Sequence, residues 1–212
     1  MKIIPTKTPN SIKLLFSKYT WDFYERKEKK IYLTFDDGPT PEITEFVLEQ
    51  LRSFNAKATF FCVGENIQKY PEIFKQIIAD DHTIGNHTMN HLKTNKTSLS
   101  NYIKNVSECD KKIKQHIAIK SKLFRPPYGN LSRSKLTQLR KLGYQIILWD
   151  VLSKDWDINT SPKQCTENVV KNTKNGSIIV FHDSIKASRN LKTTLPNILE
   201  HFTEKGYTFN KI

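Results

Sequence analysis

From residue 31 onward, short runs of β-branched and aromatic residues alternate with longer segments whose apolar residues recur at helical spacing. The strand-like runs cover residues 31–35, 58–63, 83–85, 123–125, 145–149, 177–181 and 207–209. Such an alternation is typical of successive β-α units around a parallel sheet or barrel. Seven strands with helical crossovers predict a single α/β barrel-like domain, somewhat short of an eight-fold barrel.

The helical segments between these runs begin where local chemistry favours a helix start. They are expected at residues 41–54, from Pro71 to at least Ile78, and at 99–117, 132–142, 161–174 and 189–204. Ser161 followed by Pro162 is a capping residue followed by proline at the first helical position. We find no internal repeat, linker or low-complexity segment.

Residues 1–29 differ from the rest of the chain. They form a polar extension that ends in aromatic residues, and we expect it to pack as a strap on the main domain, residues 30–212. A chain of 212 residues is long enough to bury a proper core in one domain. Its composition, 37% hydrophobic and 26% charged, is that of a globular protein and excludes a disordered one.

The net charge of +13 comes from lysines scattered along the whole chain. A basic surface favours anionic partners such as nucleic acid, an acidic polysaccharide or a cell envelope. Charge alone does not choose among them, and a solubilising surface is the simplest explanation. The oligomeric state is left open.

The three cysteines, Cys62, Cys109 and Cys165, lie far apart in the chain. This spacing supports neither a thiolate zinc site nor a disulfide framework. We see no signal peptide and no transmembrane span, so the chain as written is expected in the cytoplasm, or outside it if a leader was removed.

Unusual polar residues follow the ends of the predicted strands. In parallel α/β folds the loops at the carboxyl ends of the strands converge and carry the active site. Residues scattered at random would not show this bias. The residues concerned are Asp36 and Asp37, His87 and His91, Arg125, Asp150 and Asp155, and His182.

The first of these positions holds two adjacent carboxylates, Asp36 and Asp37, followed by Gly38-Pro39. Neighbouring aspartates at a strand end repel one another. A cation that takes one carboxylate and leaves the other free as a base would explain the pair. A turn with solvated carboxylates is the alternative.

His87 and His91 could supply neutral nitrogen ligands for such a cation. Their four-residue separation places both imidazoles on one face of a helical turn, within reach of one metal ion. With Asp37 they form a two-histidine, one-carboxylate set, which zinc accepts and which ferrous iron accepts in oxygenases. A pair of surface histidines is the alternative.

Two further positions are expected at the same mouth. His182 ends the apolar run 178–181 and would project there, unless it is an ordinary histidine satisfied at a strand end. Arg125 near the sheet's end needs a carboxylate partner, and Asp36 or Asp155 could provide it. The prolines that follow, Pro126 first, stiffen the backbone, although a rigid surface loop would look the same.

These residues resemble the motifs of the NodB-type polysaccharide deacetylases, carbohydrate esterase family 4. The resemblance spans residues 31 to about 210, and its motifs occur in the family's order. They are TFDDGP at 34–39, HTMNH at 87–91, RPPY at 125–128, DW at 155–156 and VFHD at 180–183.

The resemblance implies a distorted (β/α)7 barrel, the NodB-homology fold, and hydrolysis of an acetyl group from an N-acetylated glycan. It assigns Asp37, His87 and His91 to a divalent metal, usually Zn²⁺. The other roles it implies are Asp36 as general base, His182 as general acid, Arg125 orienting the base, Asp155 tuning His182, Trp156 and Val180 lining an acetyl pocket, and Tyr128, after Pro126, donating its N–H to the oxyanion.

The expected function is therefore a metal-dependent carbohydrate N-deacetylase acting on peptidoglycan or a chitin-like polymer of N-acetylglucosamine. The alternative is a non-catalytic, basic glycan- or nucleic-acid-binding domain on the same fold, with nucleic acid the less favoured partner. The motifs do not distinguish one glycan from another, N- from O-deacetylation, or one native metal from another.

Overall fold

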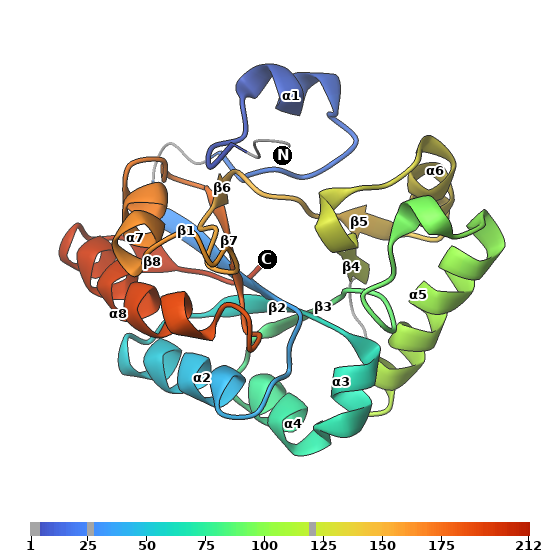
Figure 1. The fold of residues 1–212 in the computed structure, drawn as a ribbon, viewed down its shortest axis with the longest axis horizontal. Coiled ribbons are helices and arrows are strands. Elements are labelled where there is room, and N and C mark those ends of the chain that lie inside the picture. The colour runs from blue at the N-terminus through green and yellow to red at the C-terminus, as the bar shows by residue number, and fades with distance from the viewer. Residues whose placement is uncertain (1–4, 25–27, 119–121) are drawn as a thin grey trace.

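The computed structural model describes residues 5–24, 28–118 and 122–212, and in them a parallel sheet curves into an incomplete barrel surrounded by helices (Figure 1). The strand order is β5-β4-β3-β2-β1-β7-β6, with β8 beside β1. All of these pairings are parallel. The predicted α/β class and (β/α)7-type barrel are confirmed.

The strands are β1 Lys30–Asp36, β2 Ala58–Cys62, β3 Thr83–Asn86, β4 Lys122–Phe124, β5 Tyr144–Ile146, β6 Val151–Leu152, β7 Ile178–His182 and β8 Thr208–Phe209. The helices are α1 Asn10–Leu15, α2 Ile43–Ser53, α3 Gly64–Lys69, α4 Pro71–Ala79, α5 Leu99–Lys114, α6 Arg133–Lys141, α7 Pro162–Val170 and α8 Ser188–Glu204. Of the helices so described, none combines the length and the apolar character needed to cross a bilayer.

Of these strands and α-helices, α1, α3 and β6 were not predicted. The strand expected at 145–149 was also wrong beyond Ile146. There the backbone turns to the N-terminal strap, with Leu148 N–H donating to the Thr20 carbonyl at 2.8 Å. The apolar run gives no sign of this, because its partner is a distant segment of the chain.

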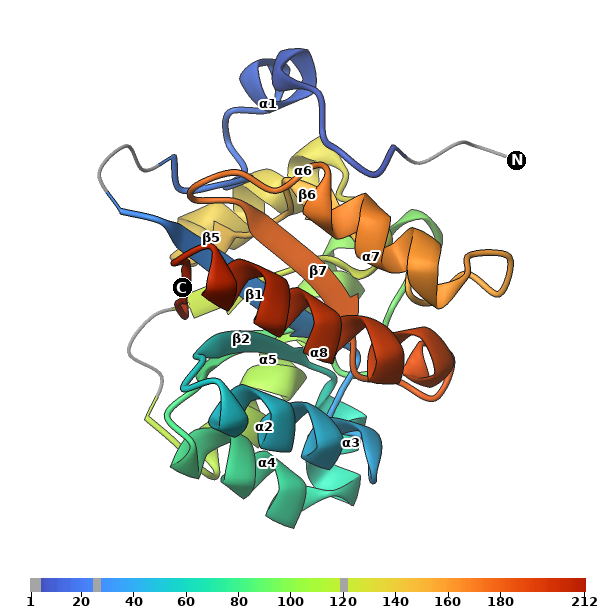
Figure 2. The same ribbon diagram turned by 90° about the vertical axis from the view of Figure 1, so that its left-hand side faces the viewer.

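Side-chain alternation along β1 and β7 gives the sheet two different faces. Leu33, Phe35 and Phe181 belong to the large core between sheet and helices, where the Phe35 and Phe181 ring centroids lie 6.0 Å apart. Thr34 and Asp36 are the alternate residues of β1, so they face the barrel interior. Figure 2 shows α8 lying across the outer side of β1 and β7.

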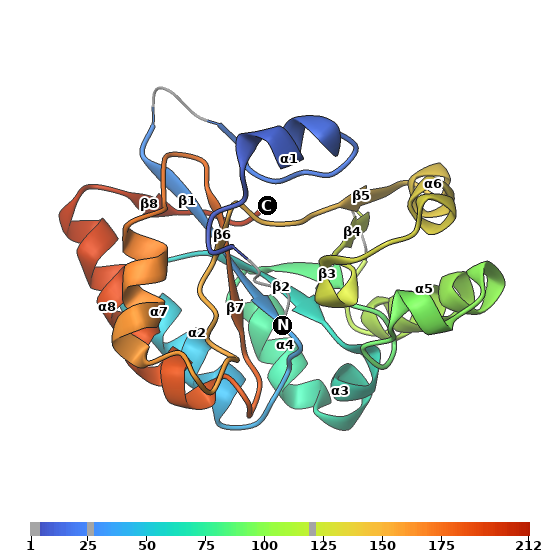
Figure 3. The same cartoon turned by 45° about the horizontal axis from the view of Figure 1, so that its top comes forward.

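Residues 5–24, which we call the strap, cross the open side of the barrel between β5 and β6 (Figure 3). Isolated bridges join Thr20 to Ile147 and Lys7 to Val151. Both Lys7 and Lys13 pair with the buried Asp150 carboxylate. Burial alone would raise the pKa of Asp150, but hydrogen bonds from these lysines and from Ser177 hold the pKa below its ordinary value.

The described part of the strap thus contacts the barrel, and residues 1–4 and 25–27 of the predicted extension lie outside the described residues. Its hydrogen bonds satisfy backbone groups that β5 and β6 would otherwise leave without partners at the gap.

Candidate active site and metal centre

Asp37, His87 and His91 come together at the mouth of the barrel. Their candidate ligand atoms all lie within 4.8 Å of one another. Asp37 Oδ1 is 3.3 Å from His91 Nε2 and 3.6 Å from His87 Nε2. That oxygen is buried without a hydrogen-bond partner, which is costly unless a cation or a proton donor occupies the space.

The histidines present the nitrogen that a metal needs. His87 Nδ1 lies 2.7 Å from the Arg125 carbonyl, which can only accept, so the proton sits on Nδ1 and the Nε2 lone pair points to Asp37. Burial lowers the pKa of His87 to about 3, so its imidazole is neutral. Two imidazole nitrogens and a carboxylate fit a divalent ion with open positions for water and substrate. The metal role stays a prediction.

The predicted helical turn at 87–91 is wrong, because this segment is an irregular loop. Thr88 and His91 have positive φ angles of 69° and 53°. Asn86 Oδ1 accepts from Thr88 N–H at 2.8 Å, and Thr88 Oγ1 accepts from Leu92 N–H at 2.9 Å. These side chains take the backbone donors that a helix would have used.

The turn that carries Asp37 is held from behind by a buried carboxyl group. Asp183 accepts from Gly38 N–H at 3.0 Å and from Thr44 Oγ1 at 2.6 Å. A Cβ on Gly38 would lie 1.9 Å from Asp183 Oδ2, so no larger residue fits. Burial raises the pKa of Asp183 to about 8. Asn66 Nδ2 also donates to the Asp37 carbonyl at 2.7 Å.

Asp36 faces the barrel interior and pairs with the fully buried Arg125. The Nη1 group of Arg125 donates to Asp36 Oδ1 and to Thr34 Oγ1, each at 2.7 Å. The remaining guanidinium donors reach the carbonyls of Ile147 and Leu148. Asp36 is therefore the carboxylate that neutralises Arg125, and Asp155 is not.

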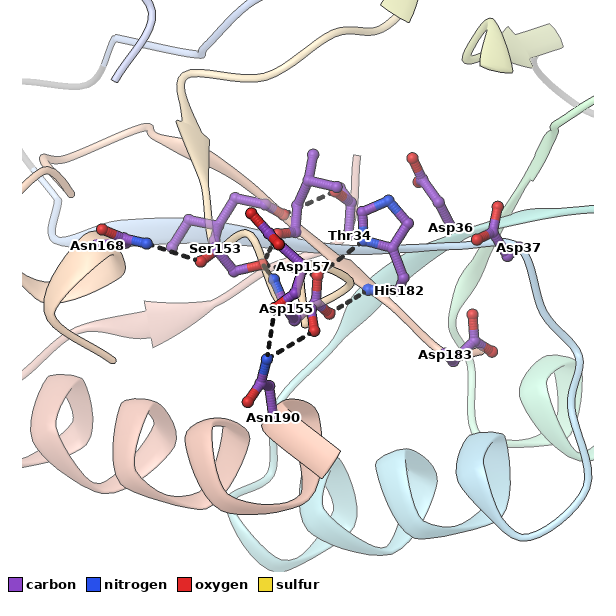
Figure 4. A network of polar contacts seen from close by, with 12 residues as sticks. Thr34, Asp36, Asp37, Ser153, Asp155, Asp157, Asn168, His182, Asp183 and Asn190 are labelled. Carbon is purple, nitrogen blue, oxygen red and sulfur yellow. Dashed lines mark hydrogen bonds and ion pairs between the residues drawn. The ribbon is translucent and has the colours of Figure 1, made fainter. Parts of the chain in front are cut away.

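His182 lies beside Asp36, because the two are register partners on β7 and β1. Its Nδ1 is 2.9 Å from Asp155 Oδ1, and its backbone N–H donates to Asp155 Oδ2 at 2.7 Å (Figure 4). Burial disfavours the imidazolium, but the Asp155 carboxylate outweighs it and raises the pKa of His182 to about 9. This imidazole is held in its protonated form.

A polar network fixes Asp155 in turn. Ser153 Oγ donates to the Val180 carbonyl at 2.7 Å and lies 3.0 Å from Asp155 Oδ1. Asn190 Nδ2 donates to the Asp155 carbonyl at 2.9 Å (Figure 4) and to the Thr160 carbonyl at 3.0 Å. Ser153, Asn190, Asn66 and the supporting role of Asp183 were not predicted from the sequence. A lone serine or asparagine in a loop carries no signal of such a role.

The remaining predicted residues surround these groups. The Trp156 ring packs edge-on against His182, with centroids 4.8 Å apart. Val180 precedes His182 by two residues and so shares its face of β7. Tyr128 is 61% exposed, has a left-handed φ of 61°, and its ring centroid lies 4.7 Å from that of His91. Pro126 is buried.

The Asp36–Arg125 pair, an imidazole whose pKa is raised, and three side chains that could hold a metal lie around one mouth, an arrangement typical of a hydrolase of the carbohydrate N-deacetylase class. A sequence model of the polysaccharide deacetylase family matches residues 24–147, which is more than half of the chain. The chain belongs to this family, carbohydrate esterase family 4 with the NodB-type fold.

Known relatives agree with this assignment. A peptidoglycan-N-acetylglucosamine deacetylase of Bacillus cereus is 36% identical over 192 residues, which is 90% of this chain and 89% of that protein. A chitooligosaccharide deacetylase of Azorhizobium caulinodans is 36% identical over 160 residues, 74% of this chain and 75% of that protein. The crystal structure of the Bc1960 peptidoglycan N-acetylglucosamine deacetylase, bound to a naphthyl-substituted N-oxidanyl-benzamide, covers 97% of this chain and 95% of its own, with 30% identity and a TM-score of 0.87.

Proposed function

We propose that this protein hydrolyses the N-acetyl group of N-acetylglucosamine residues in peptidoglycan, with a divalent metal, Zn²⁺, held by Asp37, His87 and His91. The observation that carries the proposal is a pair of polar contacts, Asp36 with Arg125 and His182 with Asp155. Asp36 and His182 lie side by side on the neighbouring strands β1 and β7. The substrate follows the peptidoglycan deacetylases, which cover more of the chain than the chitooligosaccharide enzyme does.

When bound, the metal supplies Lewis acidity that polarises the acetyl carbonyl and makes water easier to deprotonate. Asp37, with its unpartnered Oδ1, is committed to that ion. Asp36 is free to act as general base, because it lies outside the metal set and the hydrogen bond from Arg125 fixes its direction. One of two adjacent aspartates thus binds and the other accepts a proton from water.

His182 completes the hydrolysis. The oxygen of the water that Asp36 deprotonates adds to the acetyl carbon. The C–N bond breaks only when the amine nitrogen receives a proton. The His182 imidazolium donates that proton, and Asp155 keeps the ring oriented through Nδ1 so that Nε2 faces the mouth. Acetate and the free amine leave, and the proton taken by Asp36 balances the one given by His182.

Substrate contacts come from the rim. Trp156 and Val180 provide an apolar wall beside His182 that suits the acetyl methyl group. The Tyr128 N–H, in a turn stiffened by Pro126, is proposed to stabilise the developing oxyanion, a contribution of roughly 3 kcal/mol for such donors. The exposed Tyr128 ring is available to the sugar.

The test is acetate release from peptidoglycan fragments and from N-acetylated chitooligosaccharides in the presence of Zn²⁺. We expect acetate from peptidoglycan fragments, and none from Asp36→Ala. Release from chitooligosaccharides alone would transfer the proposal to that substrate. No release from either glycan by metal-loaded protein would contradict it.

A non-catalytic basic binding domain is not favoured. A pure binder has no need for a buried arginine-carboxylate pair or for an imidazole whose pKa is raised beside it. A nucleic-acid partner likewise finds no support in the comparisons.

A further inference from the structure

Helix α1 is mounted on the domain with its apolar residues outward. Leu14 is 79% exposed, Leu15 73%, Phe16 46% and Ile12 38%. None of the residues of α1 is buried. The residue that faces the domain is Lys13, whose ammonium group pairs with Asp22 and Asp150. This is the reverse of an ordinary surface helix, which buries its apolar side.

The helix projects from the barrel on the side away from α2 and α4, as Figures 1 and 2 both show. Four neighbouring apolar side chains on a projecting element form a patch of the kind that marks an interaction site. The strap holds α1 in place, because it is hydrogen-bonded to β6 and to the segment that follows β5.

An aromatic cluster borders the patch. The ring centroids of Phe16 and Tyr19 are 6.3 Å apart, and those of Tyr19 and Trp21 are 5.9 Å apart. Trp21 Nε1–H donates to the Phe16 carbonyl at 3.1 Å. Tryptophan and tyrosine are the side chains that favour the boundary between lipid headgroups and acyl chains.

Basic side chains adjoin the patch in the chain, because Lys18 follows Phe16 by two residues. Lys18 lines a hollow of about 320 Å³ together with Arg140 and Lys141 at the end of α6. All three are exposed, and within the described ranges none has a carboxylate partner. The one acid between residues 5 and 24, Asp22, is already paired with Lys13.

We propose that α1 and the basic hollow together form a docking surface for an anionic phospholipid bilayer. The apolar residues of α1 enter the interface, Tyr19 and Trp21 lie at headgroup level, and the cations bind lipid phosphates. Charge complementarity selects this occupant: an apolar patch bordered by unpaired cations suits an anionic lipid surface better than a second copy of a chain that carries +13.

The test is flotation of the whole protein with vesicles of phosphatidylcholine, with or without 30% phosphatidylglycerol, in about 0.1 M salt. We expect binding to the anionic vesicles, and a loss of about tenfold or more in Leu14→Gln/Leu15→Gln, which removes two exposed side chains. The matched control is Ile158→Gln/Ile185→Gln, whose isoleucines are 79% and 81% exposed elsewhere. It should bind as the wild type does.

The charges are tested separately. Lys18→Gln/Arg140→Gln/Lys141→Gln should weaken binding by about fivefold per charge. Lys163→Gln/Lys192→Gln/Lys205→Gln, with equally exposed lysines and the same change of charge, should weaken it far less. Circular dichroism and acetate release from a soluble glycan should be unchanged in all four variants.

Equal binding by the leucine variant and the wild type would overturn the proposal. So would equal loss in the two charge variants, which would mean non-specific attraction. A dimer seen by light scattering that dissociates in Leu14→Gln/Leu15→Gln would also overturn it, since a second copy would then cover the patch.

Discussion

The two sides of the active-site mouth hold their proposed proton-transfer groups by different means. On the side of the proposed base, which we call the base side, Asp36 pairs with Arg125, whose guanidinium also donates to backbone carbonyls inside the barrel. On the acid side, His182 is kept protonated by Asp155, which lies on a loop. The base side relies on strands and the acid side on a side-chain network, so the two should fail differently.

The largest expected effect is loss of either proton-transfer group. Asp36→Asn and His182→Asn should each lower kcat by about 10³, a typical contribution of general acid–base catalysis, with KM changing little. Steady-state acetate release measures this. His116→Asn, a histidine whose ring packs on Phe74 outside the mouth, is the control and should stay near the wild-type rate. A small effect at Asp36 or His182 would break the division into base and acid sides.

Next in size is the cost of removing the buried cation. Arg125→Met leaves Asp36 buried without a partner, and should lower the free energy of unfolding by about 4 kcal/mol. Thermal denaturation should show a fall of roughly 10 °C. Arg52→Met, whose guanidinium is largely exposed, should change stability by less than about 0.5 kcal/mol. An equally stable Arg125→Met would mean that the base side is not held as described.

The pH dependence distinguishes the acid side. Asp155→Asn removes the carboxylate that raises the pKa of His182 to about 9, so burial then lowers that pKa. The alkaline limb of the kcat/KM profile should move to lower pH. In the wild type the stability linked to this raised pKa is fully present below about 6.5 and is lost as pH rises through about 9. An unmoved limb would exclude His182 as the acid.

The smallest effects should come from two asparagines, one on each side. Asn66→Ala removes the bond to the Asp37 carbonyl, and Asn190→Ala removes those to Asp155 and Thr160. Each should cost about 1–2 kcal/mol of stability. Asn66→Ala should lower metal affinity and Asn190→Ala should lower kcat, by several-fold each. The reverse pattern, seen by calorimetry and kinetics, would contradict the assignment of sides.

The two sides also differ in how well they could be predicted from the sequence. Asp36, Asp37, His87 and His91 could be placed from their positions after strands, because parallel strands end at one edge. Arg125 could be placed there too, but its carboxylate partner could not be chosen from the sequence. Asp36 and Asp155 were equal candidates, and the hydrogen bond from Arg125 identifies Asp36.

The residues that hold Asp155 on the acid side have no comparable pattern in the sequence. Ser153 and Asn190 act through hydrogen bonds to segments distant in sequence, Ser153 to the Val180 carbonyl and Asn190 to the Asp155 carbonyl. Helix α1 was missed for a related reason: its apolar residues have no place in the core, so no core pattern points to a helix there. Local periodicity predicts elements that pack inward, and says little of those held by distant polar contacts.

The central claim is that two adjacent aspartates have separate tasks, and zinc binding to Asp36→Asn and Asp37→Asn tests it most directly. Titration calorimetry against a competing chelator measures the affinity of each variant. We expect a loss of about hundredfold or more for Asp37→Asn, the proposed ligand, and near wild-type affinity for Asp36→Asn. Equal affinities in the two variants, or a greater loss in Asp36→Asn, would contradict the claim.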